Sequence, residues 1–133
     1  MAKYYKVALS LLIIIVGFGA CSKDAPIDED GLLVTARAEC FVSNFELLGT
    51  DFVTVRSKTA AIDTAAQTIN VEVLLGTDLK NVYPQFSLAT DCKLEPKVIG
   101  KMDFSDLANP KTFTVVSGNR QIRKPYKVIV KYQ

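Results

Sequence analysis

Alternation of apolar and polar residues runs through most of this chain, and few folds other than β-sheet folds accept such a pattern. Residues 69–73 and 113–115 alternate at every position. Residues 126–132 place two tyrosines and two valines on one face of an extended segment, with two lysines on the other. Since successive side chains of a strand point to opposite faces, the pattern predicts strands with one buried and one solvated face.

Turn-forming residues divide the other hydrophobic segments into short pieces. Gly49-Thr50-Asp51 separates two of them, and Gly118-Asn119 suits a tight hairpin before the last strand. Residues 76–83 are the one segment expected to form a helical turn. Further strands are predicted within residues 34–47, 52–56, 85–88 and 97–102. About seven short strands at this spacing predict an all-β domain, a sandwich of antiparallel strands.

The first two dozen residues have the layout of a secretory signal. Lys3 and Lys6 give a positive start, an uncharged and largely apolar run follows over residues 7–20, and Gly19-Ala20-Cys21 resembles the end of a bacterial lipoprotein signal. Phe18 stands where that signal usually has Leu, Val or Ile. A transmembrane helix is disfavoured, because the uncharged run is shorter than the roughly 20 residues that a span needs.

Cleavage before Cys21 frees an amine and a thiol that can both be acylated, and two or more lipid chains hold a protein firmly on a membrane. We therefore predict a signal peptide at residues 1–20 and lipidation of Cys21. The cut also removes two lysines, so the 16 basic and 14 acidic residues of the full chain become 14 of each. The mature chain then offers no basic excess for binding nucleic acid.

A polar, acidic stretch follows the cleavage site, and we predict a flexible tether over residues 21–31 before a single domain over residues 32–133. The stretch has few large apolar side chains, so burial cannot offset the entropy lost on ordering it. Lys23-Asp24 and the acids nearby resemble a charged signal that sends lipoproteins of some Gram-negative bacteria to the cell surface. A plain solvated linker is the alternative.

A series of short landmarks runs in a fixed order from about residue 40 to the end of the chain. They are Gly76-Thr77-Asp78-Leu79, Tyr83-Pro84-Gln85-Phe86, Pro96, Asp103-Phe104-Ser105, Asn109-Pro110, Phe113-Thr114-Val115 and Tyr126-Lys127-Val128-Ile129-Val130. This order resembles a family of immunoglobulin-like β-sandwich domains of unknown function in bacterial surface lipoproteins. The resemblance implies an immunoglobulin-like fold and an outer-membrane compartment, and it supplies no catalytic residue.

Two departures from that family limit what the resemblance implies. Residues 106–108 look inserted between two of the landmarks. Family members often carry a further domain, sometimes one with an ascribed carbohydrate role. The present sequence stops at the last predicted strand, so we do not expect it to have the activity of such a domain.

Assigning Cys21 to lipid leaves Cys40 and Cys92 as an even pair. An exported protein meets oxidising conditions, which favour a disulfide between them. Such a bond closes a loop of about 53 residues and stabilises the fold by up to about 4 kcal/mol in the chain-entropy model. Two unpaired thiols are the alternative, since small buried cysteines often stay free.

Catalysis and metal binding find little support among the residue types. The chain has no histidine, which removes Ser-His and Cys-His pairs and the usual imidazole metal ligand. Asp103 and Asp106 come nearest to a carboxylate pair, but aspartates in loops more often cap turns. No spacing of the aspartates matches a calcium loop. We therefore predict a protein that is not an enzyme and has no metal site or cofactor.

Glycan binding suits the family context, although the chain has no tryptophan. Tyr83, expected in a loop beside Pro84, is the one modest candidate for stacking on a sugar. Tyr126 and Tyr132 share a face with valines and are expected in the core. Asp63-Thr64-Ala65 resembles a short O-glycosylation acceptor of exported proteins in some of these bacteria, which makes Thr64 a candidate modification site, with an unmodified loop as the alternative.

The sequence thus predicts a cell-envelope lipoprotein that is held in the outer membrane by lipid on Cys21 and faces the cell surface. The first hypothesis for its function is an accessory or binding module that contacts a glycan or a protein in an uptake or adhesion system. The alternative is a periplasm-facing structural lipoprotein that binds another envelope protein. Exposed sheet edges, or the loops at one end of the sandwich, are the natural contact surfaces.

Overall fold

The computed structural model describes residues 26–133, and the chain divides into two compact units, Met1–Leu32 and Leu33–Gln133. The predicted signal peptide and Cys21 lie outside the described residues. In the first unit, the carboxylate of Asp28 accepts hydrogen bonds from the backbone N–H groups of Asp30 and Leu32 at 3.0 and 2.9 Å. Over residues 26–133, no helix has the length and apolar character needed to cross a membrane.

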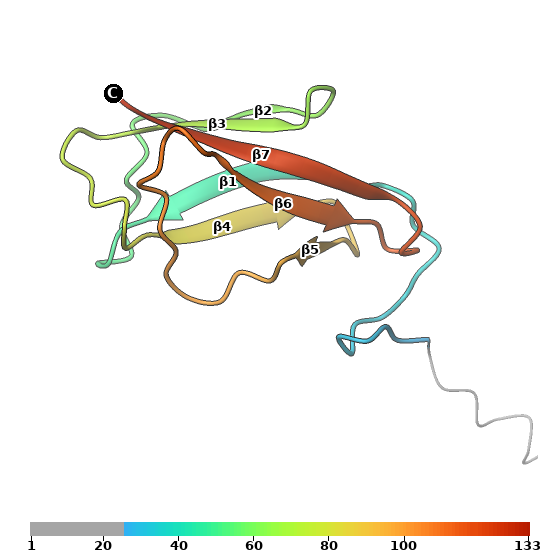
Figure 1. Cartoon of the computed structure of the whole chain (residues 1–133). Coiled ribbons are helices and arrows are strands. Elements are labelled where there is room, and N and C mark those ends of the chain that lie inside the picture. Colours follow the sequence, from blue (N-terminus) through green and yellow to red (C-terminus); the bar gives the residue numbers. More distant parts are fainter. Residues whose placement is uncertain (1–25) are drawn as a thin grey trace, which may run out of the picture. The chain divides into compact units, whose positions relative to one another are not determined.

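The second unit consists of seven strands and connecting loops, with no helix between residues 33 and 133. The strands are β1 (Val42–Leu48), β2 (Ala61–Asp63), β3 (Thr68–Val73), β4 (Tyr83–Leu88), β5 (Lys93–Glu95), β6 (Lys111–Val116) and β7 (Arg123–Tyr132). They form a two-stranded sheet, β1-β4, and a five-stranded sheet in the order β2-β3-β7-β6-β5 (Figure 1). The prediction of an all-β domain is confirmed.

The two sheets share one hydrophobic core. Phe45 of β1 and Tyr126 of β7 are fully buried in it. The ring centroids of Phe86, from β4, and Phe113, from β6, lie 4.9 Å apart, so side chains of the two sheets touch directly. Alternate residues of each strand therefore fill the space between the layers, as the period-two pattern requires.

One strand pairing departs from the antiparallel prediction. Strand β3 runs parallel to β7, with Ile69 opposite Val128 and Val73 opposite Tyr132, whereas the other strand pairs are antiparallel. Parallel neighbours need a long connection, and here β4, β5 and β6 all lie between the two strands in the chain. The alternation within a strand does not encode the direction of its partner, so the sequence pattern could not reveal this pair.

Several local predictions are also corrected. Residues 76–83 form turns and the start of β4 instead of a helical turn, and Gly76 adopts a left-handed conformation with φ 84°. Strands β2 and β5 are not predicted by the sequence, because three residues carry too little alternation to be detected. Within the strand predicted at 97–102, only Met102 pairs, through an isolated bridge to Val82.

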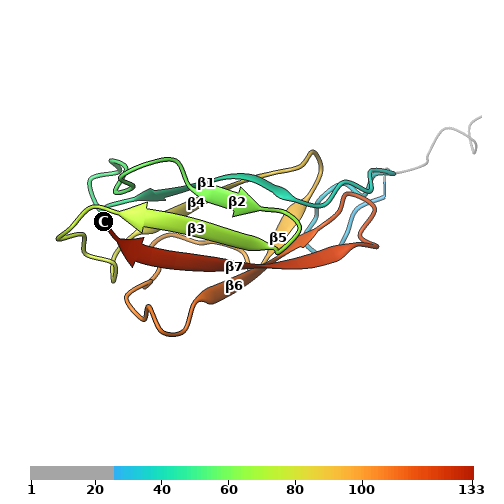
Figure 2. The same cartoon turned by 90° about the horizontal axis from the view of Figure 1, so that it is seen from above.

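The connections of the second unit gather at its two ends (Figures 1 and 2). Residues 49–53 and 74–82 lie at the end where β1 and β3 finish, and we call this the distal loop end. Residues 33–41 enter the domain at the opposite end. There the N–H of Thr35 donates a hydrogen bond to the carbonyl of Gly118 at 2.9 Å, beside the hairpin between β6 and β7.

Candidate functional site

An exposed phenylalanine and a half-buried tyrosine form an aromatic pair at the distal loop end. The rings of Phe52, in the loop after β1, and Tyr83, the first residue of β4, have centroids 4.7 Å apart and an interplanar angle of 32°. Phe52 is 64% exposed and its neighbour Val53 is 57% exposed. Together these side chains offer an apolar aromatic surface of the kind that can stack on the apolar face of a ligand.

The backbone of Phe52 is held in an unfavourable conformation, with φ 61°. The N–H of Phe52 donates to the carbonyl of Gly49 at 3.0 Å, and the N–H of Gly49 donates to the carbonyl of Val53 at 2.9 Å, which closes a short hairpin loop. The left-handed position of such a loop usually holds glycine, and a side chain there costs about 1–2 kcal/mol. A bulky, exposed and strained residue at this point suggests a role beyond folding.

A partly shielded ion pair fixes the loop that carries Phe52. Arg56 Nη2 lies 2.7 Å from Glu46 Oε2, and the side chains of Arg56 and Glu46 are only 15% and 24% exposed. Arg56 Nη1 also donates to the carbonyl of Phe45 at 2.7 Å, and the hydroxyl of Thr54 donates to Glu46 Oε1 at 2.6 Å. These charge-assisted hydrogen bonds hold the segment after Phe52 against β1 and so position the aromatic pair.

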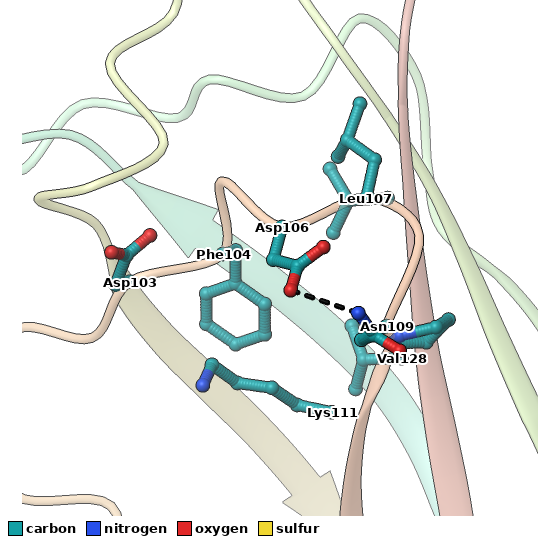
Figure 3. Close-up of a pocket in the computed structure, with 9 residues that line it drawn as sticks. Asp103, Phe104, Asp106, Leu107, Asn109, Lys111 and Val128 are labelled. Atoms are coloured by element: carbon teal, nitrogen blue, oxygen red, sulfur yellow. Dashed lines mark hydrogen bonds between the residues drawn. The ribbon is translucent and has the colours of Figure 1, made fainter.

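A cavity of about 320 Å³ lies between the loop that precedes β6 and the central strand β7. Phe104, Asn109 and Lys111 line it, with Val128 of β7 as part of its apolar wall (Figure 3). Lys111 Nζ is 5.9 Å from the centre of the Phe104 ring, which is a weak cation–π contact. The cavity therefore combines one lysine, two aspartates and an apolar floor.

The carboxylates at this cavity accept hydrogen bonds from residues of their own loop. Asp103 accepts hydrogen bonds from the N–H and the hydroxyl of Ser105 at 2.8 and 2.5 Å, and these bonds lower the pKa of Asp103. Asp106 accepts a hydrogen bond from the side-chain amide of Asn109 at 3.0 Å. Both aspartates cap turns, as their loop positions predict, and the lowered pKa of Asp103 is the reverse of what a general acid needs.

The other residues that the sequence singles out lie in different parts of the domain. Tyr83 lies in strand β4 instead of a loop, and it gains the ring of Phe52 as a neighbour. Thr64 is exposed in the turn between β2 and β3. Tyr126 is buried as expected, whereas Tyr132 lies at the end of β7 and is 40% exposed, contrary to its predicted place in the core.

Phe52 is the candidate that the sequence reasoning missed. The sequence places it at the start of a predicted strand over residues 52–56, but only Thr54 and Arg56 form isolated bridges there. The available signal was the turn Gly49-Thr50-Asp51, because the residue that closes such a turn often takes a left-handed conformation.

Cys40 and Cys92 lie at the opposite end of the domain and are free thiols in the structure. The buried thiol of Cys40 donates to the carbonyl of Val115 at 3.2 Å, and the half-buried thiol of Cys92 donates to the carbonyl of Glu39 at 3.0 Å. Burial raises the pKa of both thiols. Neither is an activated nucleophile, because both stay protonated near neutral pH.

Comparisons with known proteins find one matching family model and similar solved structures from Bacteroides. A family model described as "SGBP, N-terminal" matches residues 50–130. A solved structure of a proposed glycoside hydrolase from Bacteroides thetaiotaomicron is 26% identical to this chain, with a TM-score of 0.59 over 72% of it. The search of curated proteins gives no match.

Two further solved structures share the fold at lower identity. A DUF4623 family protein from Bacteroides eggerthii is 18% identical with a TM-score of 0.52, and a proposed secreted protein from Bacteroides fragilis is 11% identical with a TM-score of 0.50; each match covers 71% of this chain. The chain spans 26% of the length of the first structure, 22% of the second and 96% of the third. For the first two proteins the likeness is therefore confined to about a quarter of a longer chain.

Proposed function

We propose that this chain, which belongs to the SGBP N-terminal family, is a non-catalytic module that binds glycans at the surface of a Bacteroidetes cell. The family is one of surface glycan-binding proteins, and the three similar solved structures described above come from Bacteroides species. The family match over residues 50–130 includes both members of the aromatic pair. The seven strands in two packed sheets support an immunoglobulin-like sandwich as the scaffold.

The observation that carries the proposal is the aromatic pair of the exposed Phe52 and the half-buried Tyr83. Saturated sugar rings have faces of C–H groups that stack on aromatic rings, and this contact needs no charge and no catalytic group. The pair sits at one end of the domain, with Phe52 on a loop and Tyr83 at the start of β4, and binding residues are often found on such loop ends. The loop carries a large side chain at Phe52 even though the left-handed backbone there is strained, which supports a role for the ring in binding.

We also propose that lipid on Cys21 anchors the module in the outer membrane, with the distal loop end available to soluble glycans. The lipoprotein signal in the sequence supports this arrangement, as does the position of residues 33–41 at the end of the domain opposite Phe52. Labelling cells with alkyne palmitate tests it, because the Cys21→Ser variant is expected to lose the label. External protease should cut the wild-type protein on intact cells, and cleavage only after lysis would place it on the periplasmic face.

Substitution of Phe52 tests the glycan site. We expect affinity electrophoresis through gels that contain amylopectin, xyloglucan or β-glucan to show retardation by at least one polysaccharide. Phe52→Ala and Phe52→Gly should each weaken that binding about tenfold or more, since loss of one stacking ring removes on the order of 1–2 kcal/mol.

Phe41→Ala is the matched control, because Phe41 is also exposed but lies at the opposite end of the domain. It should bind as the wild type does. Equal binding by wild type and both Phe52 variants would mean that the glycan sits elsewhere. No retardation by any polysaccharide, repeated on an array of plant and host glycans, would reject glycan binding and favour a protein partner.

A further inference from the structure

Two cysteines from distant parts of the chain meet where residues 33–41 join the domain. Cys40 lies two residues before β1, and Cys92 lies between β4 and β5. The Cys92 side chain lies near enough to the Cys40 thiol to contribute to lowering its pKa, against the larger effect of burial. It also donates to the carbonyl of Glu39, the residue before Cys40, at 3.0 Å. Neighbouring sulfur atoms are the first requirement for a disulfide.

Contacts of the surrounding residues hold the two segments together independently of the sulfur atoms. The N–H of Ala89 donates to the carbonyl of Phe41 at 3.0 Å, and the N–H of Cys92 donates to the carbonyl of Ala89 at 3.1 Å. On the other side of Cys40, Arg37 Nε lies 3.4 Å from a carboxylate oxygen of Asp91, the residue before Cys92. The backbone therefore presents both cysteines to each other in the folded state.

We infer that Cys40 and Cys92 form a disulfide in the exported protein. The bond fastens the segment that precedes β1 to the turn that precedes β5, and the closed loop contains β1, β2, β3 and β4. A crosslink over so long a loop restricts the unfolded chain strongly. The inference does not depend on what the aromatic pair binds.

Formation of the bond follows thiol–disulfide exchange with a donor disulfide, either an envelope thiol oxidoreductase or oxidised glutathione in the test tube. Cys40 is 4% exposed and Cys92 is half-buried, so Cys92 is the thiol that a donor reaches. The Cys92 thiolate, having lost its proton to water, attacks one donor sulfur. The donor S–S bond breaks, and its second sulfur leaves as a thiolate that takes up a proton.

The thiolate of Cys40 then attacks the sulfur of Cys92 in this mixed disulfide. The Cys40–Cys92 bond forms, and the second donor thiol leaves and is protonated. The two cysteines are oxidised by two electrons together, and the donor disulfide is reduced by two.

Peptide mapping tests the inference on the full chain. Protein isolated from the envelope is quenched in acid, unfolded, alkylated with N-ethylmaleimide without reductant, and digested. Trypsin leaves Cys40 in peptide 38–56 and Cys92 in peptide 81–93. We expect these two peptides joined, lighter by two hydrogens than their sum and separated by reductant. Maleimide on both peptides, even after incubation of the folded protein with oxidised glutathione at pH 8, would overturn the inference.

Thermal unfolding gives a second, independent readout. Reductant is expected to lower the Tm of the wild type by about 5–20 °C, because the crosslink spans a long loop. The Cys92→Ser variant should unfold at the reduced temperature and ignore reductant, whereas the Cys21→Ser control should keep the wild-type response. A wild-type Tm that ignores reductant, or a disulfide-linked dimer on a non-reducing gel in place of the internal bond, contradicts the inference.

Discussion

At the scale of single residues, Phe52 is the position where folding and the proposed function make opposite demands. The loop needs a left-handed conformation there, which glycine adopts without cost and phenylalanine does not. The ring is 64% exposed, so burial contributes little in return. Among the described residues, the ring that it contacts is that of Tyr83. A residue that serves stability alone would not be large, exposed and strained at once.

Comparison of two substitutions at Phe52 separates these roles. Both Phe52→Ala and Phe52→Gly remove the ring, but only glycine relieves the left-handed strain. We expect the glycine variant to be more stable than the alanine variant by about 1 kcal/mol, and close to the wild type, in urea unfolding. Both should lose glycan binding equally. A glycine variant that unfolds much more easily than the alanine variant would show that φ at this residue is not left-handed in solution.

At the scale of elements, the hairpin that extends β1 past Phe52 is held by backbone hydrogen bonds and by side chains together. Its strand forms only isolated bridges, Leu48 with Thr54 and Arg56 with Val73. The ion pair of Arg56 with Glu46 reinforces it, since both side chains are largely shielded from water. The aromatic pair therefore depends on residues that do not contact a ligand.

Removal of the Arg56 guanidinium should loosen this loop. Arg56→Met leaves the carboxylate of Glu46 without its cation, at an expected cost of about 1–3 kcal/mol in unfolding free energy. Hydrogen exchange of the Val55 amide, which donates to the carbonyl of Leu47 at 2.9 Å, should become faster. Weaker glycan binding with an unchanged ligand preference is expected to follow.

Lys58→Met is the control for that experiment. Lys58 is 68% exposed and pairs with Glu72 at 3.5 Å, a surface contact that contributes less than about 1 kcal/mol. The control should change neither the exchange of the Val55 amide nor binding. If the two variants behave alike, the ion pair does not hold the loop.

At the scale of the whole molecule, the C-terminal strand completes the fold. Strand β7 is hydrogen-bonded to β3 on one side and to β6 on the other, so the five-stranded sheet cannot assemble without it. It also contributes Tyr126 and Val128 to the shared core. These contacts join residues that are far apart in the sequence. We therefore expect cooperative folding that requires the last residues of the chain.

Truncation at the N-terminal end should therefore preserve cooperative unfolding, and truncation at the C-terminal end should abolish it. The fragment 33–133 contains every strand and the core, so we expect it to unfold cooperatively in urea. The chain that stops at residue 122 lacks β7 and should show no cooperative transition, because β3 and β6 lose the strand between them. Cooperative unfolding of the chain without β7 would contradict this account of the sheet.

The sequence by itself determined the all-β class and most of the strands, because alternation is a local property that a half-buried strand must have. It predicted the buried Tyr126 and the turn-capping role of Asp103 and Asp106. Only the tertiary structure decided the parallel pairing of β3 with β7 and the meeting of Phe52 with Tyr83. Each of these joins residues far apart in the chain, and the pattern along a strand carries no information about which distant segment will lie beside it.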